Sequence, residues 1–199
     1  MKTVRPRAST STPSAAPADG PSVPGLPWSW GATPAEVAAP YGCAGLVPHP
    51  YRALWRAVDV AAPAARTYRW LRQLKVAPYS YDWIDNFGRR SPRRLTPELD
   101  EIAVGDTFLI FRVVAVGPGS EFTVVTLPAA ERLFGPVAVT YRVTSVDDSH
   151  SRLVVRLDTS SGGLIGRLRR VALAWGDLIM MRKQLLTLKH LAEAQRPAG

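Results

Sequence analysis

The sequence predicts an α+β fold in which a curved antiparallel sheet wraps around a long C-terminal helix. Between residues 107 and 158 apolar and polar residues alternate in four segments, which is the period of a half-buried strand. From residue 164 to about residue 195 the apolar residues instead recur every three or four positions, as on one face of a helix. Because such a helix must bury its apolar face, the apolar side of the sheet is its expected partner.

The composition excludes several classes of protein. Of the 199 residues 46% are hydrophobic and six are tryptophan, enough apolar surface for one core, so the chain is not a wholly disordered polymer. A single cysteine, Cys43, permits no intrachain disulfide, and three scattered histidines offer no metal-ligand spacing. No apolar stretch reaches the roughly 18 residues that a helix needs to cross a bilayer. No apolar stretch follows the basic N-terminus, as it would in a secretory signal. We therefore expect a cytoplasmic protein without a membrane span or a bound metal.

The charge of the chain is positive but carries little functional information. The net charge is +9, from 25 basic and 16 acidic residues. Residues 89–94 contain four arginines and residues 167–170 contain three. Clustered cations can bind nucleic acid by releasing counterions from its phosphates. No nucleic-acid-binding motif accompanies these clusters, so we interpret them as a solvated face and expect no nucleic acid as a partner.

Three parts follow one another along the chain. Residues 1–27 are rich in Ser, Thr, Pro, Ala and Gly and have few large apolar side chains, which predicts a disordered N-terminal tail. Residues 28–50 contain two tryptophans and a short helix that begins after Thr33 with Pro34 in its first turn. We expect this second part to pack on the main domain, residues 51–195, as an irregular strap.

The main domain reads as strand, helix, strands and terminal helix. A strand is predicted over residues 51–60 and a helix over residues 64–74, after Pro63. Four more strands are predicted at residues 107–116, 122–127, 137–146 and 152–158. In the last two, Val and Leu alternate with Thr and Arg, which predicts a sheet with one solvent-exposed face.

One apolar stripe runs along the terminal helix. Its steps of three and four residues average 3.5 over eight intervals, so we expect a single face to stay buried for about 32 residues, roughly 48 Å. The stripe consists of Leu164, Leu168, Val171, Trp175, Leu178, Met181, Leu185, Leu188 and Ala192.

These segments, in this order, resemble the SRPBCC superfamily, which includes polyketide cyclase/dehydrase and lipid-transport proteins. The resemblance extends from about Trp30 to Glu193. It is carried by WGAT at residues 30–33, VDVAAPAARTYRWLRQ at 58–73, YDWIDN at 81–86, LTPEL at 95–99, VGD at 104–106 and RKQLLTLKHLAE at 182–193.

The resemblance implies a helix-grip fold of the START and Bet v 1 type, normally with seven strands. It also implies a hydrophobic cavity between the sheet and the C-terminal helix, in which a small hydrophobic ligand binds. Since fewer than seven strands are evident in the sequence, a short additional one is expected around Leu133 and Phe134.

Several residues are candidates for contact with that ligand. Tyr79, Tyr81 and Trp83 lie within five positions and form either an aromatic mouth or an anchor for their loop. Their acidic neighbours Asp82 and Asp85, with Asn86, are interpreted as structural.

Arg112 interrupts an apolar run and would bind a carboxylate or enolate if it pointed into the cavity, or reach into water from the outer face. Tyr141, Trp175 and Met181 fall on the predicted inner stripes, where they line a cavity or simply pack the core.

Two main functions follow from the cavity. The first is a binding protein for a small hydrophobic ligand, lipid or polyketide-like and with an aromatic body. The second is a cyclase/aromatase-type enzyme that uses Tyr79, Tyr81 and Arg112 in the same cavity, which requires polar groups that face one another. A basic scaffold that binds nucleic acid is the third hypothesis. No glycine-rich phosphate loop stands between a strand and a helix, so no nucleotide or other cofactor is expected.

Overall fold

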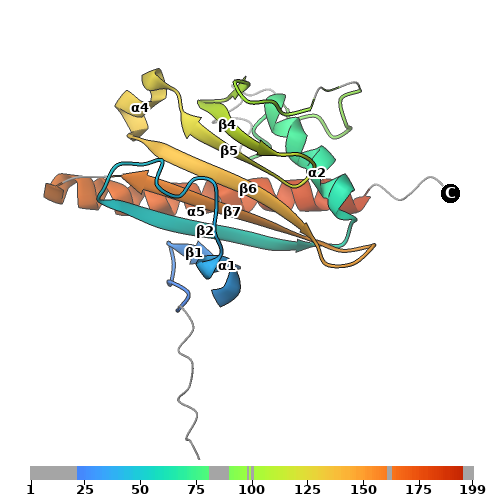
Figure 1. The fold of residues 1–199 in the computed structure, drawn as a ribbon, viewed down its shortest axis with the longest axis horizontal. Helices are drawn as coiled ribbons and strands as arrows, with labels where there is room; N and C mark the ends of the chain where they lie inside the picture. Colours follow the sequence, from blue (N-terminus) through green and yellow to red (C-terminus); the bar gives the residue numbers. More distant parts are fainter. Residues whose placement is uncertain (1–21, 81–89, 98, 100, 161–162, 195–199) are drawn as a thin grey trace, which may run out of the picture.

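The computed structural model describes residues 22–80, 90–97, 99, 101–160 and 163–194, the side chains of residues 163–169 excepted. Seven strands form one sheet in the order β1-β2-β7-β6-β5-β4-β3 (Figure 1). Strand β1 pairs with β2 in parallel, and the other neighbours are antiparallel. The strands are β1 (Ser29–Trp30), β2 (Tyr51–Val60), β3 (Thr107–Phe108), β4 (Phe111–Gly117), β5 (Glu121–Thr126), β6 (Val137–Ser145) and β7 (Ser151–Ser160).

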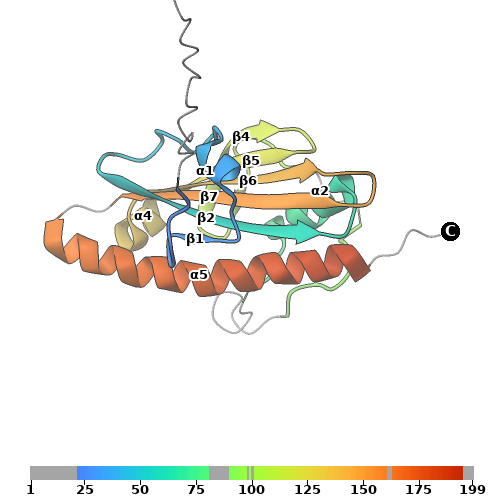
Figure 2. The ribbon, with the colours of Figure 1, turned by 90° about the horizontal axis from the view of Figure 1, so that it is seen from below.

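The 32-residue helix α5 (Gly163–Ala194) lies along one side of this sheet, and α1 lies on the opposite side (Figure 2). Helix α5 contacts β2 along its length and packs on α2 (Ala64–Arg72), which continues into the 3-10 turn η1 (Gln73–Lys75). The other helices among the described residues are α1 (Pro34–Ala38) and α4 (Pro128–Phe134). The predicted architecture of sheet and terminal helix is therefore confirmed.

The main core lies between the inner face of the sheet and helices α2 and α5. Alternate residues of each strand enter it, as the period of two requires. Phe122 stacks on Tyr141 with ring centroids 5.1 Å apart, and Phe108 meets Phe122 edge-on. Leu185 and Leu188 of α5 are fully buried in the same core.

The outer face of the sheet is covered by residues 32–47. Tyr41, Cys43 and Val47 form a second buried cluster with Ala57 and Val154. The Cys43 amide donates to Thr140 Oγ1, and Thr140 in turn shares a hydrogen bond of 2.8 Å with Thr123. The expectation of a solvent-exposed second face is therefore wrong in this region: the polar outer residues bind the strap instead of water.

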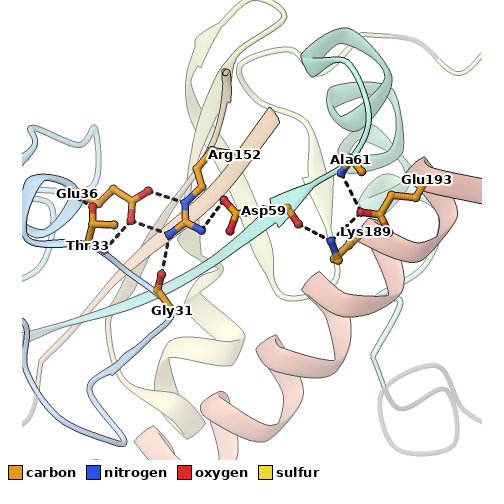
Figure 3. Close-up of polar contacts among 8 residues, drawn as sticks. All are labelled: Gly31, Thr33, Glu36, Asp59, Ala61, Arg152, Lys189 and Glu193. Atoms are coloured by element: carbon orange, nitrogen blue, oxygen red, sulfur yellow. Dashed lines mark hydrogen bonds and ion pairs between the residues drawn. The ribbon is translucent and has the colours of Figure 1, made fainter. Parts of the chain in front are cut away.

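Arg152 of β7 ties the strap to the sheet (Figure 3). Its guanidinium lies 2.7 and 3.0 Å from the two carboxylate oxygens of Glu36 and donates to the Gly31 carbonyl and to Asp59. Glu36 also caps α1 through a reciprocal pair of hydrogen bonds with Thr33. Gly31 must be glycine here, since its φ is +75° and a Cβ would lie 2.2 Å from the Ala57 carbonyl oxygen.

Two strand predictions need correction. Leu133 and Phe134, expected in a short strand, end the helix α4, which begins at Pro128 in the first-turn position that proline favours. The predicted strand at residues 107–116 is a hairpin of β3 and β4, because the chain turns at Leu109, whose φ is +53°. The remaining two of the seven strands are β1 and β3, which have two residues each and are too short to show a period.

The contacts of Arg152 lead to a stability prediction. Replacing Arg152 with Met removes the partner of the half-buried Glu36 carboxylate, and we expect the free energy of unfolding to fall by about 2 kcal/mol. Urea denaturation measures this loss. The matched control is Asp59→Asn, which removes the other carboxylate of the same arginine. Since the Asp59 side chain is 86% exposed, its loss should cost no more than about 0.5 kcal/mol. Equal losses in both variants would contradict the proposed role of Glu36.

Candidate functional site

A buried ion pair crosses from the sheet to α5. Arg56 of β2 points to the inner face, because it pairs in register with the core residue Val155. Its side chain is 1% exposed, and Nη2 lies 2.8 Å from Asp177 Oδ2. The same guanidinium donates to the carbonyls of Trp28 and Trp55. One side chain therefore joins β1, β2 and α5.

Burial acts on both charges of this pair. It raises the pKa of Asp177 to about 6, although the charge and hydrogen bond of Arg56 act in the opposite direction. It also lowers the pKa of the Arg56 guanidinium, against the effect of Asp177. The 2.8 Å contact keeps the two groups paired, so the site is held by an ion pair that burial opposes.

A second polar contact lies further along the same side of α5. The Tyr141 hydroxyl donates to Gln184 Oε1 at 3.3 Å and also approaches Met181 Sδ at 3.9 Å. Gln184 Nε2 donates to the Pro78 carbonyl at 2.7 Å. Burial, and to a smaller extent the Asp177 charge, raises the pKa of the Tyr141 hydroxyl, which therefore stays protonated as a donor.

A pocket of about 590 Å³ opens beside this contact, between the C-terminal half of α5 and the segment around residues 90–93. None of its described lining residues belongs to the sheet, so it is not the cavity between the sheet and α5 that the resemblance implied. Tyr79, the residue after Pro78, lines it and is only 1% exposed. Its φ is +56°, a conformation that a tyrosine rarely adopts, and its ring packs edge-on against the buried Trp70. The lining consists of Tyr79, Ser80, Arg90, Ser91, Arg93, Lys183, Leu186, Thr187, His190 and Leu191.

The aromatic candidates divide into two groups. Tyr79 lies in the pocket wall. Tyr81 and Trp83, with the acidic neighbours Asp82 and Asp85, fall outside the residues that the structure describes.

Arg112 does not point into the interior. It pairs with Val125, a residue that packs on the outer cluster under the strap, so Arg112 shares that outer side and is exposed. The prediction of an arginine inside the cavity is wrong, because the turn at Leu109 sets the register of β4 and brings Val113 to the core in its place.

The three predicted residues of the inner stripes also differ in position. Tyr141 and Met181 are buried in the core and touch each other, and neither belongs to the described pocket lining. Trp175 is 46% exposed, so the expectation that it lines the interior is wrong. A straight helix with 3.6 residues per turn drifts about 20° per heptad away from a 3.5-residue stripe. The buried positions instead follow a period of about 3.6 residues through Ala174, Leu178, Met181, Leu185, Leu188 and Ala192, so Trp175 lies about 100° away from the buried face.

Sequence reasoning missed most of the pocket. Lys183, Leu186, Thr187, His190 and Leu191 follow the spacing 3, 1, 3, 1 and therefore share one helix face. This spacing was a usable signal, but the face mixes cations with leucines and does not stand out as an apolar stripe. Arg90 and Arg93 belong to a basic cluster that was interpreted as a solvated face.

Two other features, a metal site and a membrane-spanning helix, are absent from the described part of the chain. Within it no group of three His, Cys, Asp or Glu side chains is placed to hold a metal ion. None of its helices has the length and apolar character needed to span a membrane.

Solved structures share this architecture. The truncated norcoclaurine synthase from Thalictrum flavum is similar with a TM-score of 0.50 and 12% identity, over 73% of this chain and 96% of the synthase. This chain has a helix-grip fold. An aromatase/cyclase from Streptomyces sp. R1128 is similar at 20% identity, over 75% of this chain and 98% of the other, with a TM-score of 0.42.

The resemblance of the sequence to the SRPBCC superfamily is thus confirmed at the level of the helix-grip fold. No family model matches the sequence, and no curated protein matches it.

The Arg56–Asp177 pair predicts a dependence of stability on pH. The pKa of Asp177 is about 6 in the folded protein against an ordinary value of 3.8, so the folded state binds this proton more tightly. Its contribution to stability is complete below about pH 4 and is lost as the pH rises through 6. Between pH 4 and 7 the variant Asp177→Asn should therefore gain stability relative to the wild type, by on the order of 3 kcal/mol. Urea denaturation of both proteins across this range measures the difference, in which other titrating groups cancel. Parallel profiles would contradict the raised pKa.

Proposed function

We propose that this protein binds a small hydrophobic ligand, with an aromatic or lipid-like body, in the pocket between α5 and residues 90–93. The observation that carries the proposal is the pocket itself. Its volume of about 590 Å³ lies within the range of roughly 300 to 1,000 Å³ that small-molecule sites occupy.

The lining supports a partly apolar guest. Leu186 and Leu191 lie about one and a half turns apart on the helix wall, and Tyr79 lines the same pocket. Leu186 is 38% exposed, so a bound apolar body would remove leucine surface from water at about 25 cal/mol per Å². Polar side chains at the rim would fix the orientation of the ligand.

The backbone around the pocket is held from the core side. Gln184 holds the Pro78 carbonyl, and Tyr79 is anchored by burial against Trp70. Two neighbouring walls, the helix and the chain at residues 78–79, therefore keep their spacing without a ligand. Such preorganisation reduces the entropy that binding costs.

The cyclase-type alternative has less support. It needs at least two polar groups that face one another over a substrate, and Arg112 was its cation. Arg112 lies on the outer face, so of the three residues proposed for the enzyme only Tyr79 is among the described pocket residues. Since a shared fold does not imply a shared reaction, the geometry supports binding best.

Filling the pocket tests this function. The neutral fluorescent probe N-phenyl-1-naphthylamine offers an aromatic body of suitable size. The substitution Thr187→Trp places a large side chain on the helix wall and should weaken binding of the probe by about tenfold or more. Fluorescence titration measures the affinity. The matched control is Ala172→Trp, which adds the same side chain to an exposed position of α5 outside the pocket. If Thr187→Trp binds the probe as the wild type does, this pocket is not the site.

A further inference from the structure

The described pocket lining is cationic. Arg90, Arg93 and Lys183 supply three cations among its ten residues, His190 adds an imidazole, and none of the ten is a carboxylate. The other residues are apolar or carry hydroxyl groups. A neutral apolar guest would need none of these four side chains.

The cations of the pocket differ from the arginines and lysines that form ion pairs within the fold. Arg56, Arg142, Arg152 and Arg156 on the sheet are each paired with a carboxylate, as are Lys75 and Lys189 on the helical side. Among the residues whose side chains are described, no ion pair joins Arg90, Arg93 or Lys183 to an acidic group. The pocket thus gathers cations that the described fold does not neutralise.

Polar and apolar residues alternate along the α5 wall of the pocket. Lys183 and His190 are seven residues apart, about 10 Å along the helix axis, with Leu186 between them. The helix dipole does not explain Lys183, since its effect is confined to the last turn and α5 continues to Ala194. A ligand that contacts both kinds of residue on this wall has an apolar body and an anionic end.

We infer that the ligand is an anionic amphiphile, whose acidic group binds at the cationic rim formed by Arg90, Arg93 and Lys183 while its apolar body covers Leu186 and Leu191. This inference rests on the proposed function. The guanidinium fork and the ammonium both recognise carboxylate, sulfonate and phosphate oxygens. The class is therefore defined by its charge and its apolar body, and a carboxylate and a phosphate satisfy it alike.

Two probes that differ by a single acidic group test the inference. N-phenyl-1-naphthylamine is neutral, and 8-anilino-1-naphthalenesulfonate has the same ring system with one sulfonate. Wild-type protein should bind the anionic probe about tenfold more tightly or better, and added salt should reduce this preference because the rim is exposed. The double variant Arg93→Gln/Lys183→Gln should lose the preference and keep its affinity for the neutral probe.

The control has the same change in net charge. Arg112→Gln/Arg132→Gln removes two exposed arginines, one on the outer face of β4 and one on α4, both outside the pocket. It should bind both probes as the wild type does. An equal loss of the anionic preference in this variant would assign the preference to overall charge and overturn the inference.

The remaining outcomes separate the two proposals. If the wild type binds both probes equally and Thr187→Trp removes both, the pocket binds hydrophobic ligands and the inference of an anionic ligand is wrong. If Thr187→Trp leaves both affinities unchanged, the proposed function itself fails. Circular dichroism of each variant confirms that the exposed substitutions leave the fold intact.

Discussion

The ion pair between Arg56 and Asp177 sets the rotation of α5 on the sheet. A helix with apolar residues all around its circumference could pack in several rotations with similar burial. Asp177 removes that freedom, because only one rotation brings its carboxylate to Arg56, the one arginine of the described residues that is buried on the inner face. Gln184 lies seven residues later on the same side and reaches both Tyr141 and the Pro78 carbonyl. With that side facing the core, Lys183, Leu186 and His190 are turned toward the segment around residues 90–93, where the pocket forms.

Such a pair gives specificity of packing more than stability. Burial raises the pKa of Asp177 and lowers that of Arg56, so it disfavours the charged form of both groups. Replacing a buried pair by apolar residues often leaves a protein equally stable. Here, however, the alternative rotations of α5 would leave Arg56 buried without a carboxylate, and that cost disfavours them. The strap works in a similar way on the outer face, where Arg152 holds Glu36 and Gly31. Both faces of the sheet are therefore covered near β2 and β7.

The sequence predicted the layers of the fold correctly and the wall of the pocket poorly, for physical reasons. Strand period, turn residues and the length of the terminal helix are local properties, and they indicated the sheet and helix. Arg112 was misplaced because a single left-handed residue, Leu109, sets the register of β4, and one residue of register exchanges the two faces of a strand. Trp175 was misplaced because the buried face of α5 runs through its neighbour Ala174, which is too small to stand out in the apolar pattern. The pocket joins residues 79–80 and 90–93 to residues 183–191, a contact across about half the chain that no local pattern encodes.

The expected energies of the charge interactions indicate which part of the pocket supplies affinity and which part sets the orientation of the ligand. Two unit charges about 10 Å apart in water interact by only about 0.4 kcal/mol, so exposed cations can share a rim without a neutralising carboxylate. For the same reason a single contact between an exposed cation and an anion contributes at most about 1 kcal/mol. Most of the affinity must then come from the apolar body over Leu186 and Leu191. The cationic rim selects which end of the guest lies outward, since a ligand bound in the reverse orientation would bury apolar surface against arginine and leave its charge against leucine.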